Sequence, residues 1–247
     1  MSTSAAIEVE FPVSFEGAPA DVRGALYLPD APGVHPGLVV IPDVRGLYAH
    51  YHDVARRVAA QGFATLALDI YSREGAPELP DMAAVSEWIR TLPDLRVLAD
   101  VEAAIAFLAA RPEVAGRKVG LTGFCMGGKY AFLAAARCRG LSAVVGWYGM
   151  LRNPERDAAN PEDALDALGE LEIPLLGLFG QDDPIVPRSD VEALEQLGRT
   201  RPCPVEVVVY PGAGHAFAND SRPEAYRADA AADGWRRAFE FLHRHLD

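Results

Sequence analysis

The amino-acid sequence predicts an α/β fold, with a mostly parallel central sheet and helices on both faces. Continuous apolar runs, typical of strands buried on both faces, alternate along the chain with segments of helical spacing. Two segments near the N-terminus instead alternate apolar and polar residues, which indicates strands with one exposed face. Because parallel neighbours need a crossover connection, this order of elements favours a mostly parallel sheet after an antiparallel N-terminal strand pair.

The elements follow in order along the chain. An antiparallel pair is expected at 7–11 and 22–28, and buried strands at 37–41, 63–68, 118–122, 143–147, 175–179 and 205–210. Helical spacing covers 51–61, 80–110 with a break near Pro93, 129–136 and 223–245, and the polar segment 153–160 is expected to be a surface loop. Since no repeat, low-complexity segment or linker stands out, residues 1–247 are expected to form a single α/β domain.

Composition excludes several classes of function. Half of the residues are hydrophobic, and 23 Lys and Arg against 35 Asp and Glu give a formal charge of −12. A partner such as nucleic acid or an anionic membrane requires a basic face, and no basic cluster is present. The N-terminus has no signal-peptide pattern, and no apolar run is long enough to span a membrane. We therefore expect a cytoplasmic protein without nucleic-acid or membrane partners.

The cysteines favour a reducing compartment. There are three, Cys125, Cys138 and Cys203, and no two have Cys-x-x-Cys spacing. An odd number without paired spacing argues against a disulfide framework and against a structural zinc site. Cys138 and Cys203 are expected to be small buried hydrophobic residues.

Cys125 stands in a different setting. It lies at the apex of Gly123-Phe124-Cys125-Met126-Gly127-Gly128, between an apolar strand and a helical segment. The pattern Gly-x-nucleophile-x-Gly is typical of a nucleophile elbow, where the tight turn leaves no room for side chains two residues away. Such a turn places the cysteine at a helix N-terminus, where backbone N–H groups and the helix dipole favour a thiolate. Covalent catalysis by Cys125 is the resulting hypothesis.

A catalytic cysteine needs a base and a group that orients the base. Gly180-Gln181-Asp182-Asp183-Pro184 follows the expected strand 175–179, and Gly212-Ala213-Gly214-His215 follows the strand 205–210. The order nucleophile, acid, histidine is the one that α/β-hydrolases use. All three groups come after the carboxyl ends of strands, where open α/β sheets bind ligands.

Together these motifs resemble the dienelactone hydrolase family, a branch of the α/β-hydrolase fold, over nearly the whole chain. The resemblance implies that Cys125 is the nucleophile, His215 the base and Asp183, which begins the family's Asp-x-x-Val-Pro segment, the orienting acid. It implies hydrolysis of a small-molecule ester or lactone through a thioester, with no cofactor and no metal. The oligomeric state is expected to be a monomer or a small homo-oligomer.

The resemblance also assigns the loop after strand 37–41. In well-known members a glutamate there hydrogen-bonds the resting thiol and takes its proton, and here the residue is Asp43, one methylene shorter. The same loop is expected to supply the Val44 N–H, which would form an oxyanion hole with the Met126 N–H. Asp43 has a second interpretation as a cap of the following helix.

Substrate contacts are the least specific part of the prediction. Well-known members hold a substrate carboxylate with two arginines, and the position of one of them is Asn219 here. Arg73 is a candidate for the other, and Arg45 is a candidate to compensate. Tyr48 and Tyr148 are expected to line the pocket.

Other functions fit parts of the sequence. A general carboxylesterase and a catalytically silent hydrolase fold used for binding are compatible with the same elements. Gly123 to Lys129 also matches Gly-x-x-x-x-Gly-Lys, the phosphate-binding loop, but Tyr130 stands where magnesium binding requires Ser or Thr. His50 and His52 are expected on the solvent face of a helix start.

Overall fold

A single eight-stranded sheet forms the centre of the computed structural model, which describes residues 5–153 and 156–247. The strand order is β1-β2-β4-β3-β5-β6-β7-β8. The strands are β1 (Ile7–Phe15), β2 (Ala18–Tyr27), β3 (Gly37–Ile41), β4 (Ala64–Asp69), β5 (Val119–Phe124), β6 (Leu141–Trp147), β7 (Leu175–Gly180) and β8 (Val205–Tyr210). β2 pairs antiparallel with β1 and β4, and all other neighbouring strands run parallel.

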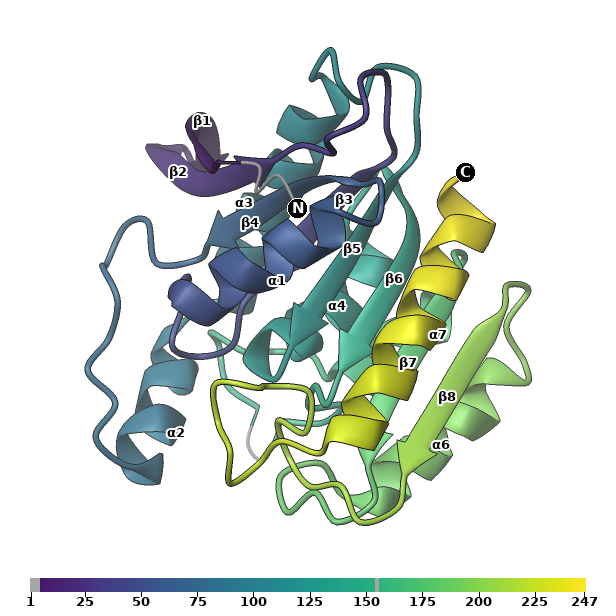
Figure 1. The fold of residues 1–247 in the computed structure, drawn as a ribbon. Coiled ribbons are helices and arrows are strands. Elements are labelled where there is room, and N and C mark those ends of the chain that lie inside the picture. The colour runs from purple at the N-terminus through teal and green to yellow at the C-terminus, as the bar shows by residue number, and fades with distance from the viewer. Residues whose placement is uncertain (1–4, 154–155) are drawn as a thin grey trace.

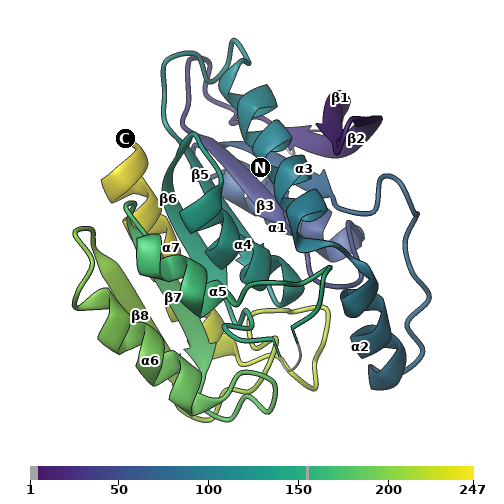
Figure 2. The same ribbon diagram turned by 180° about the vertical axis from the view of Figure 1, so that it is seen from behind.

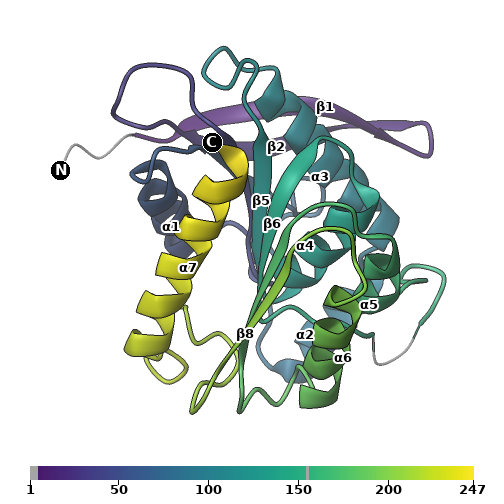
Figure 3. The same ribbon diagram turned by 90° about the vertical axis from the view of Figure 1, so that its right-hand side faces the viewer.

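Helices cover both faces of this sheet. They are α1 (Ala49–Ala59), α2 (Met82–Thr91), α3 (Asp94–Ala109), α4 (Met126–Arg137), α5 (Ala164–Ala167), the 3₁₀ turn η1 (Leu168–Glu170), α6 (Arg188–Gly198) and α7 (Ala228–Leu246). Helices α1 and α7 lie in front of the sheet in Figure 1. Helices α3, α4, α5 and α6 lie on the opposite face, which Figure 2 shows directly and Figure 3 shows from the side. The mostly parallel sheet and its antiparallel N-terminal pair were predicted from the sequence.

Several element ends and one loop differ from the prediction. The last helix begins at Ala228, because 219–227 forms turns such as Arg222 N–H to Asn219 O (3.1 Å) and Tyr226 N–H to Arg222 O (2.9 Å). The predicted surface loop 153–160 contains Pro154 and Glu155, which lie outside the described residues. Its last residue, Asn160, is buried, so the surface assignment is wrong at that position.

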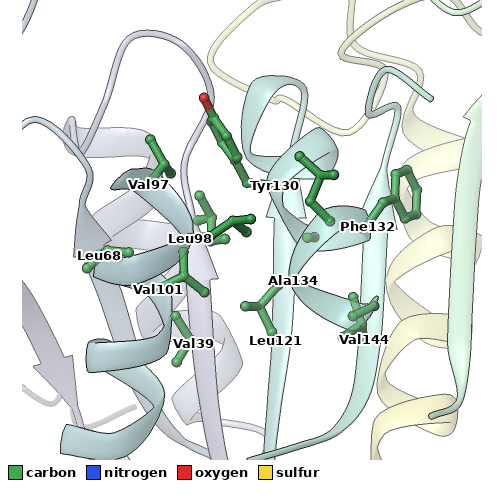
Figure 4. Close-up of a cluster of buried hydrophobic side chains, with 14 of the residues drawn as sticks. Val39, Leu68, Val97, Leu98, Val101, Leu121, Tyr130, Phe132, Ala134 and Val144 are labelled. Atoms are coloured by element: carbon green, nitrogen blue, oxygen red, sulfur yellow. The ribbon is translucent and has the colours of Figure 1, made fainter. Parts of the chain in front are cut away.

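The core consists of one apolar layer on each face of the sheet. Figure 4 shows part of the layer beneath α3 and α4, where Val39 and Leu121 of the sheet lie close to Val101 of α3 and Ala134 of α4. These strands are apolar on both faces because both faces are covered, as expected for the centre of a parallel sheet. The close packing of these two apolar layers fixes the positions of the strand ends. In the part of the chain that the structure describes, no helix is both long and apolar enough to cross a membrane.

The topology brings distant segments together at one edge. The carboxyl ends of β3, β5, β7 and β8 point to the lower edge of the sheet in Figure 1. The loops that leave those ends carry Asp43, Cys125, Asp183 and His215. This edge is where ligands bind in open α/β sheets.

Candidate active site

Cys125 occupies a sharp turn between β5 and α4. Its backbone has φ 56° and ψ −115°, a conformation that costs a non-glycine residue about 1–3 kcal/mol and persists only where the surroundings impose it. Its N–H donates to the Trp147 carbonyl oxygen at 3.0 Å, and its carbonyl oxygen accepts from the Lys129 N–H at 3.1 Å. The turn is therefore held from the sheet side and from the helix side.

The flanking glycines explain the spacing of the motif. A Cβ at Gly123 would lie 2.0 Å from the Gly127 carbonyl oxygen. A Cβ at Gly127 would lie 2.4 Å from the carbonyl oxygens of Ile41 and Pro42. The turn thus excludes side chains on both sides of the cysteine, and the end of β3 runs directly against the first turn of α4.

The structure brings Cys125, His215 and Asp183 into a continuous line of contacts. His215 Nε2 lies 3.0 Å from Cys125 Sγ, and His215 Nδ1 lies 2.8 Å from Asp183 Oδ2. Each residue follows a different strand, namely β5, β8 and β7, so the packing of the sheet sets the alignment. This is the geometry of a nucleophile, its base and the carboxylate that orients the base.

Both carboxylate oxygens of Asp183 have partners. Its Oδ1 accepts from the backbone N–H groups of Ile185 (2.8 Å) and Val186 (3.2 Å), which fixes the turn that it begins. Its Oδ2 faces the imidazole of His215. Asp183 is buried whereas the neighbouring Asp182 is exposed, so Asp183 is the carboxylate of this pair that meets the histidine.

The imidazole of His215 is strongly basic in this setting. Burial lowers its pKa, but the negative charge of Cys125 and the hydrogen bonds to Asp183 and Cys125 outweigh it and raise the pKa of His215 from 6.5 to about 10. Both ring nitrogens have a partner that can carry negative charge, which favours the doubly protonated ring. The arrangement therefore favours the imidazolium form of His215.

Asp43 is buried near the cysteine but is paired elsewhere. Its Oδ1 accepts from the Arg45 N–H at 2.9 Å, and its Oδ2 accepts from the Tyr48 hydroxyl at 3.4 Å. The Tyr48 hydroxyl in turn accepts from Asn219 Nδ2 at 3.0 Å. The N-cap of α1 is Tyr48, so Asp43 does not cap that helix. In this conformation Cys125 Sγ contacts His215. A contact between the Asp43 carboxylate and the Cys125 thiol therefore stays a prediction.

Val44, which follows Asp43, and Met126, which follows Cys125, are both buried. Met126 is the first residue of α4, where backbone N–H groups have no partner within the helix. Val44 lies in the loop after β3, which contacts that same helix end through Gly127. The two N–H groups predicted for an oxyanion hole thus come from neighbouring segments.

Tyr148 lies directly against the imidazole. Its ring packs edge-on against His215, with centroids 5.2 Å apart. The side chain is buried, and its hydroxyl has no hydrogen-bond partner among the described residues. Burial raises the pKa of Tyr148 well above its usual value, with a further contribution from Asp43, so the phenol stays protonated. It is a free donor next to the cysteine and histidine.

The two candidate arginines lie in different settings. Arg73 Nη1 and Nη2 contact the two oxygens of Asp100 at 2.5 and 2.8 Å, so that guanidinium is committed to a carboxylate of α3. Arg45 is exposed at the rim of the loop after β3. Asn219 is buried and holds Tyr48 and Ser221, whose hydroxyl donates to Asn219 Oδ1 at 2.6 Å. Substrate binding by these residues stays a prediction.

The structure argues against the phosphate-binding interpretation of Gly123 to Lys129. Lys129 Nζ is buried and donates to Asp94 Oδ1 at 2.9 Å and to Asn160 Oδ1 at 3.0 Å. A phosphate-binding lysine must instead reach the ligand. Lys129 joins α4 to the start of α3 and to the segment before α5.

Some residues around the cysteine were not found from the sequence. Tyr71 donates to the Val44 carbonyl oxygen at 2.8 Å, and no local motif marks it. His50, expected on a solvent face, is buried, because it lies 3.0 Å from Asp220 and packs against Tyr48 and Tyr51. Among residues 5–153 and 156–247, no group of three or more His, Cys, Asp or Glu side chains is placed to hold a metal ion.

Comparisons with known proteins point to one family. The model of the "Dienelactone hydrolase family" matches residues 22–246. A candidate carboxymethylenebutenolidase of Escherichia coli (strain K12) is 36% identical over 217 residues, covering 86% of this chain and 78% of the relative. The crystal structure of a candidate dienelactone hydrolase from Klebsiella pneumoniae is 33% identical, with a TM-score of 0.87 and coverage of 98% of this chain and 100% of that one. A dienelactone hydrolase-like promiscuous phosphotriesterase from metagenomic libraries is 28% identical, with a TM-score of 0.79 and coverage of 98% and 100%.

Proposed function

This chain belongs to the dienelactone hydrolase family, and from that premise we propose that it hydrolyses small carboxylic esters or lactones through a thioester on Cys125. Its fold is the α/β-hydrolase fold of that family. One observation carries the proposal. His215 Nε2 lies 3.0 Å from Cys125 Sγ, while His215 Nδ1 lies 2.8 Å from Asp183 Oδ2.

The first half of the proposed reaction acylates the cysteine. The Cys125 thiolate attacks the substrate carbonyl carbon, and the carbonyl oxygen takes the electron pair as an oxyanion. The N–H groups of Val44 and Met126 hold that oxyanion, a contribution of about 3 kcal/mol for each donor. When the oxyanion collapses, the C–O bond breaks, and the His215 imidazolium gives its Nε2 proton to the departing alkoxide. The product of this half is an alcohol and a thioester.

The second half releases the acid. His215, now neutral, takes a proton from a water molecule, whose oxygen attacks the thioester carbonyl at the same oxyanion hole. The C–S bond breaks, and the thiolate–imidazolium pair forms again. Asp183 holds the ring in one tautomer and stabilises its positive charge in both halves. Because the thiolate and the protein dipoles supply all of this chemistry, the proposal requires no cofactor.

Asp43 is proposed to take the thiol proton when Cys125 is protonated in the resting enzyme. Two observations support this role. Asp43 is buried, and its negative charge is the second cause, after burial, of the raised pKa of Tyr148, which lies against His215. Tyr148 and Tyr48 are proposed to contact the substrate. Tyr148 packs against His215 and its hydroxyl has no partner among the described residues, while the Tyr48 hydroxyl donates to Asp43. Arg45 at the rim is proposed to meet any negative charge on the substrate.

The test uses p-nitrophenyl acetate and iodoacetamide with wild type and Cys125→Ala. We expect hydrolysis by wild type, rapid alkylation of Cys125 at neutral pH with parallel loss of activity, and no hydrolysis by Cys125→Ala with an unchanged melting temperature. Mass spectrometry of acid-quenched wild type should detect an acetyl group on Cys125. Full activity in Cys125→Ala would overturn the proposed nucleophile. Slow alkylation together with no hydrolysis of any ester would support the catalytically silent binding protein.

A substrate screen then separates lactones from open esters. Small lactones and esters, neutral and negatively charged, are compared by kcat/KM in wild type and Cys125→Ala. A preference for lactones supports the dienelactone hydrolase type of activity, and a preference for open esters supports a general carboxylesterase.

A further inference from the structure

Tyr71 contacts both residues whose N–H groups we assign to the oxyanion hole. Its hydroxyl donates to the Val44 carbonyl oxygen at 2.8 Å and lies 3.9 Å from Met126 Sδ. The side chain is buried, so water does not compete for the Val44 carbonyl oxygen. One phenol therefore spans the loop after β3 and the first residue of α4.

The sheet explains how Tyr71 reaches this place. β3 lies between β4 and β5, so the loop that leaves β3 lies between the segment after β4, which carries Tyr71, and the start of α4. Tyr71 is fixed at this position by its own N–H, which donates to Asp69 Oδ1 at 3.1 Å. Its ring is confined as well. Trp88 of α2 packs edge-on against it at 5.7 Å, and a Cβ at Gly46 would lie 2.7 Å from its Cδ2 atom.

The carbonyl of Val44 matters because the N–H of the same residue is one of the two proposed donors. Donors aimed at a developing oxyanion are effective only when their direction is fixed before the reaction. The loop of Val44 belongs to neither a helix nor a strand. The peptide that follows Val44 is held at both of its polar groups, since its carbonyl accepts from Tyr71 and its N–H, that of Arg45, donates to Asp43 Oδ1. Burial raises the pKa of Tyr71, so its hydroxyl remains a donor over the working pH range.

We propose that Tyr71 is a positioning residue for acyl transfer. It fixes the peptide between Val44 and Arg45, limits rotation of the adjoining peptide that carries the Val44 N–H, and thereby aims the oxyanion hole. The proposal rests on the proposed function, since it presupposes an oxyanion formed by attack of Cys125. Tyr71 itself touches no reacting atom. Its effect belongs to the transition state and leaves the nucleophilicity of the sulfur unchanged.

Two reactions of the same cysteine separate this role from a merely structural one. Acyl transfer from p-nitrophenyl acetate passes through a tetrahedral oxyanion. Alkylation by iodoacetamide displaces iodide at a saturated carbon, so it forms no oxyanion. Tyr71→Phe keeps the ring and removes only the hydroxyl. We expect it to lower kcat about 10- to 100-fold, with KM and the rate of alkylation within about twofold of wild type.

Tyr27→Phe is the matched control. Tyr27, the last residue of β2, is also a buried tyrosine, and its hydroxyl lies 2.8 Å from His52 Nδ1 of α1. Loss of either hydroxyl should lower the melting temperature to a similar, small degree. Only Tyr71→Phe should lower kcat.

Three outcomes overturn the inference. They are an unchanged kcat in Tyr71→Phe, an equal loss of kcat in Tyr27→Phe, and a parallel loss of acyl transfer and alkylation, which would show that Tyr71 acts on the sulfur or on the fold. The proposed function is judged separately by Cys125→Ala. If that variant is inactive while Tyr71→Phe is fully active, the function stands and the positioning role falls.

Discussion

Gly127→Ala tests whether the contact between the elbow and the loop after β3 controls the chemistry. A Cβ at Gly127 would lie 2.4 Å from two backbone oxygens, of Ile41 and Pro42, whereas ordinary contacts begin at 3.4 Å. Backbone atoms cannot rotate away as a side chain can. The end of β3, or the first turn of α4, must therefore move by about 1 Å, and a displacement of that size near reacting groups can cost about 100-fold in rate.

The expected loss of stability is opposite in sign to the effect of helix propensity. Gly127 lies inside α4, where alanine is favoured over glycine by about 1 kcal/mol. Overpacking of this kind costs about 1–3 kcal/mol. We therefore expect a lower melting temperature and a kcat/KM for p-nitrophenyl acetate reduced about 100-fold, with most of the loss in kcat.

Gly169→Ala is the control for this substitution. A Cβ at Gly169 would meet no atom within 4 Å, and its φ is not positive, so the same change of residue type carries no clash there. Gly169→Ala should match wild type in both measurements. A Gly127→Ala enzyme with wild-type kcat/KM and melting temperature would refute the reasoning, because the loop would then tolerate the displacement that we treat as damaging.

Three further predictions concern single side chains. Because the pKa of His215 is raised to about 10, wild-type kcat/KM should decline only as pH rises through about 10, and Asp183→Asn should move that decline to lower pH; a pH–rate profile with the same alkaline limb in both enzymes would contradict this. Lys129→Met leaves the carboxylate of Asp94 buried without its cation, so urea denaturation should show a free energy of unfolding lower by about 3–5 kcal/mol, and unchanged stability would argue against the pairing. Burial raises the pKa of Cys138 to about 12, so peptide mapping after iodoacetamide treatment at neutral pH should find it unmodified when the elbow cysteine is fully labelled.

The elbow and its partners were predictable because their signals are local. Gly123 and Gly127 are required by steric conflict within a few residues, and such conflict leaves a fixed spacing in the sequence. Asp183 follows the buried strand β7, and His215 follows the edge strand β8, which was expected to be buried and is only partly so. The edge of the sheet on which they meet follows from the alternation of strands and helices. Local chemistry and simple topology therefore predicted which segments meet, whereas the choice of Asp183 over Asp182 came from the resemblance to the family.

The contacts that surround this alignment depend on tertiary packing, which leaves no local pattern. Tyr71 and Val44 are separated by 27 positions, and Tyr48 and Asn219 by 171. The pairing of Lys129 with Asp94 could not be predicted either, because a lysine in a glycine-rich turn has the same local pattern whether it is buried or exposed. Sequence spacing predicts which face or edge a residue occupies, but which residue it contacts depends on the tertiary structure.

The reactive groups lie at one edge of the sheet, and an exposed turn at the opposite edge is therefore available for attachment. The proposed site lies entirely at the carboxyl ends of the strands, whereas the turn before β5, at 115–118, leaves the opposite edge and is exposed. Gly116 has a φ of +77° and open space around it. An immobilisation tag inserted at this turn would attach the enzyme to a solid support with its substrate entrance facing the bulk liquid, without touching any strand end that carries chemistry.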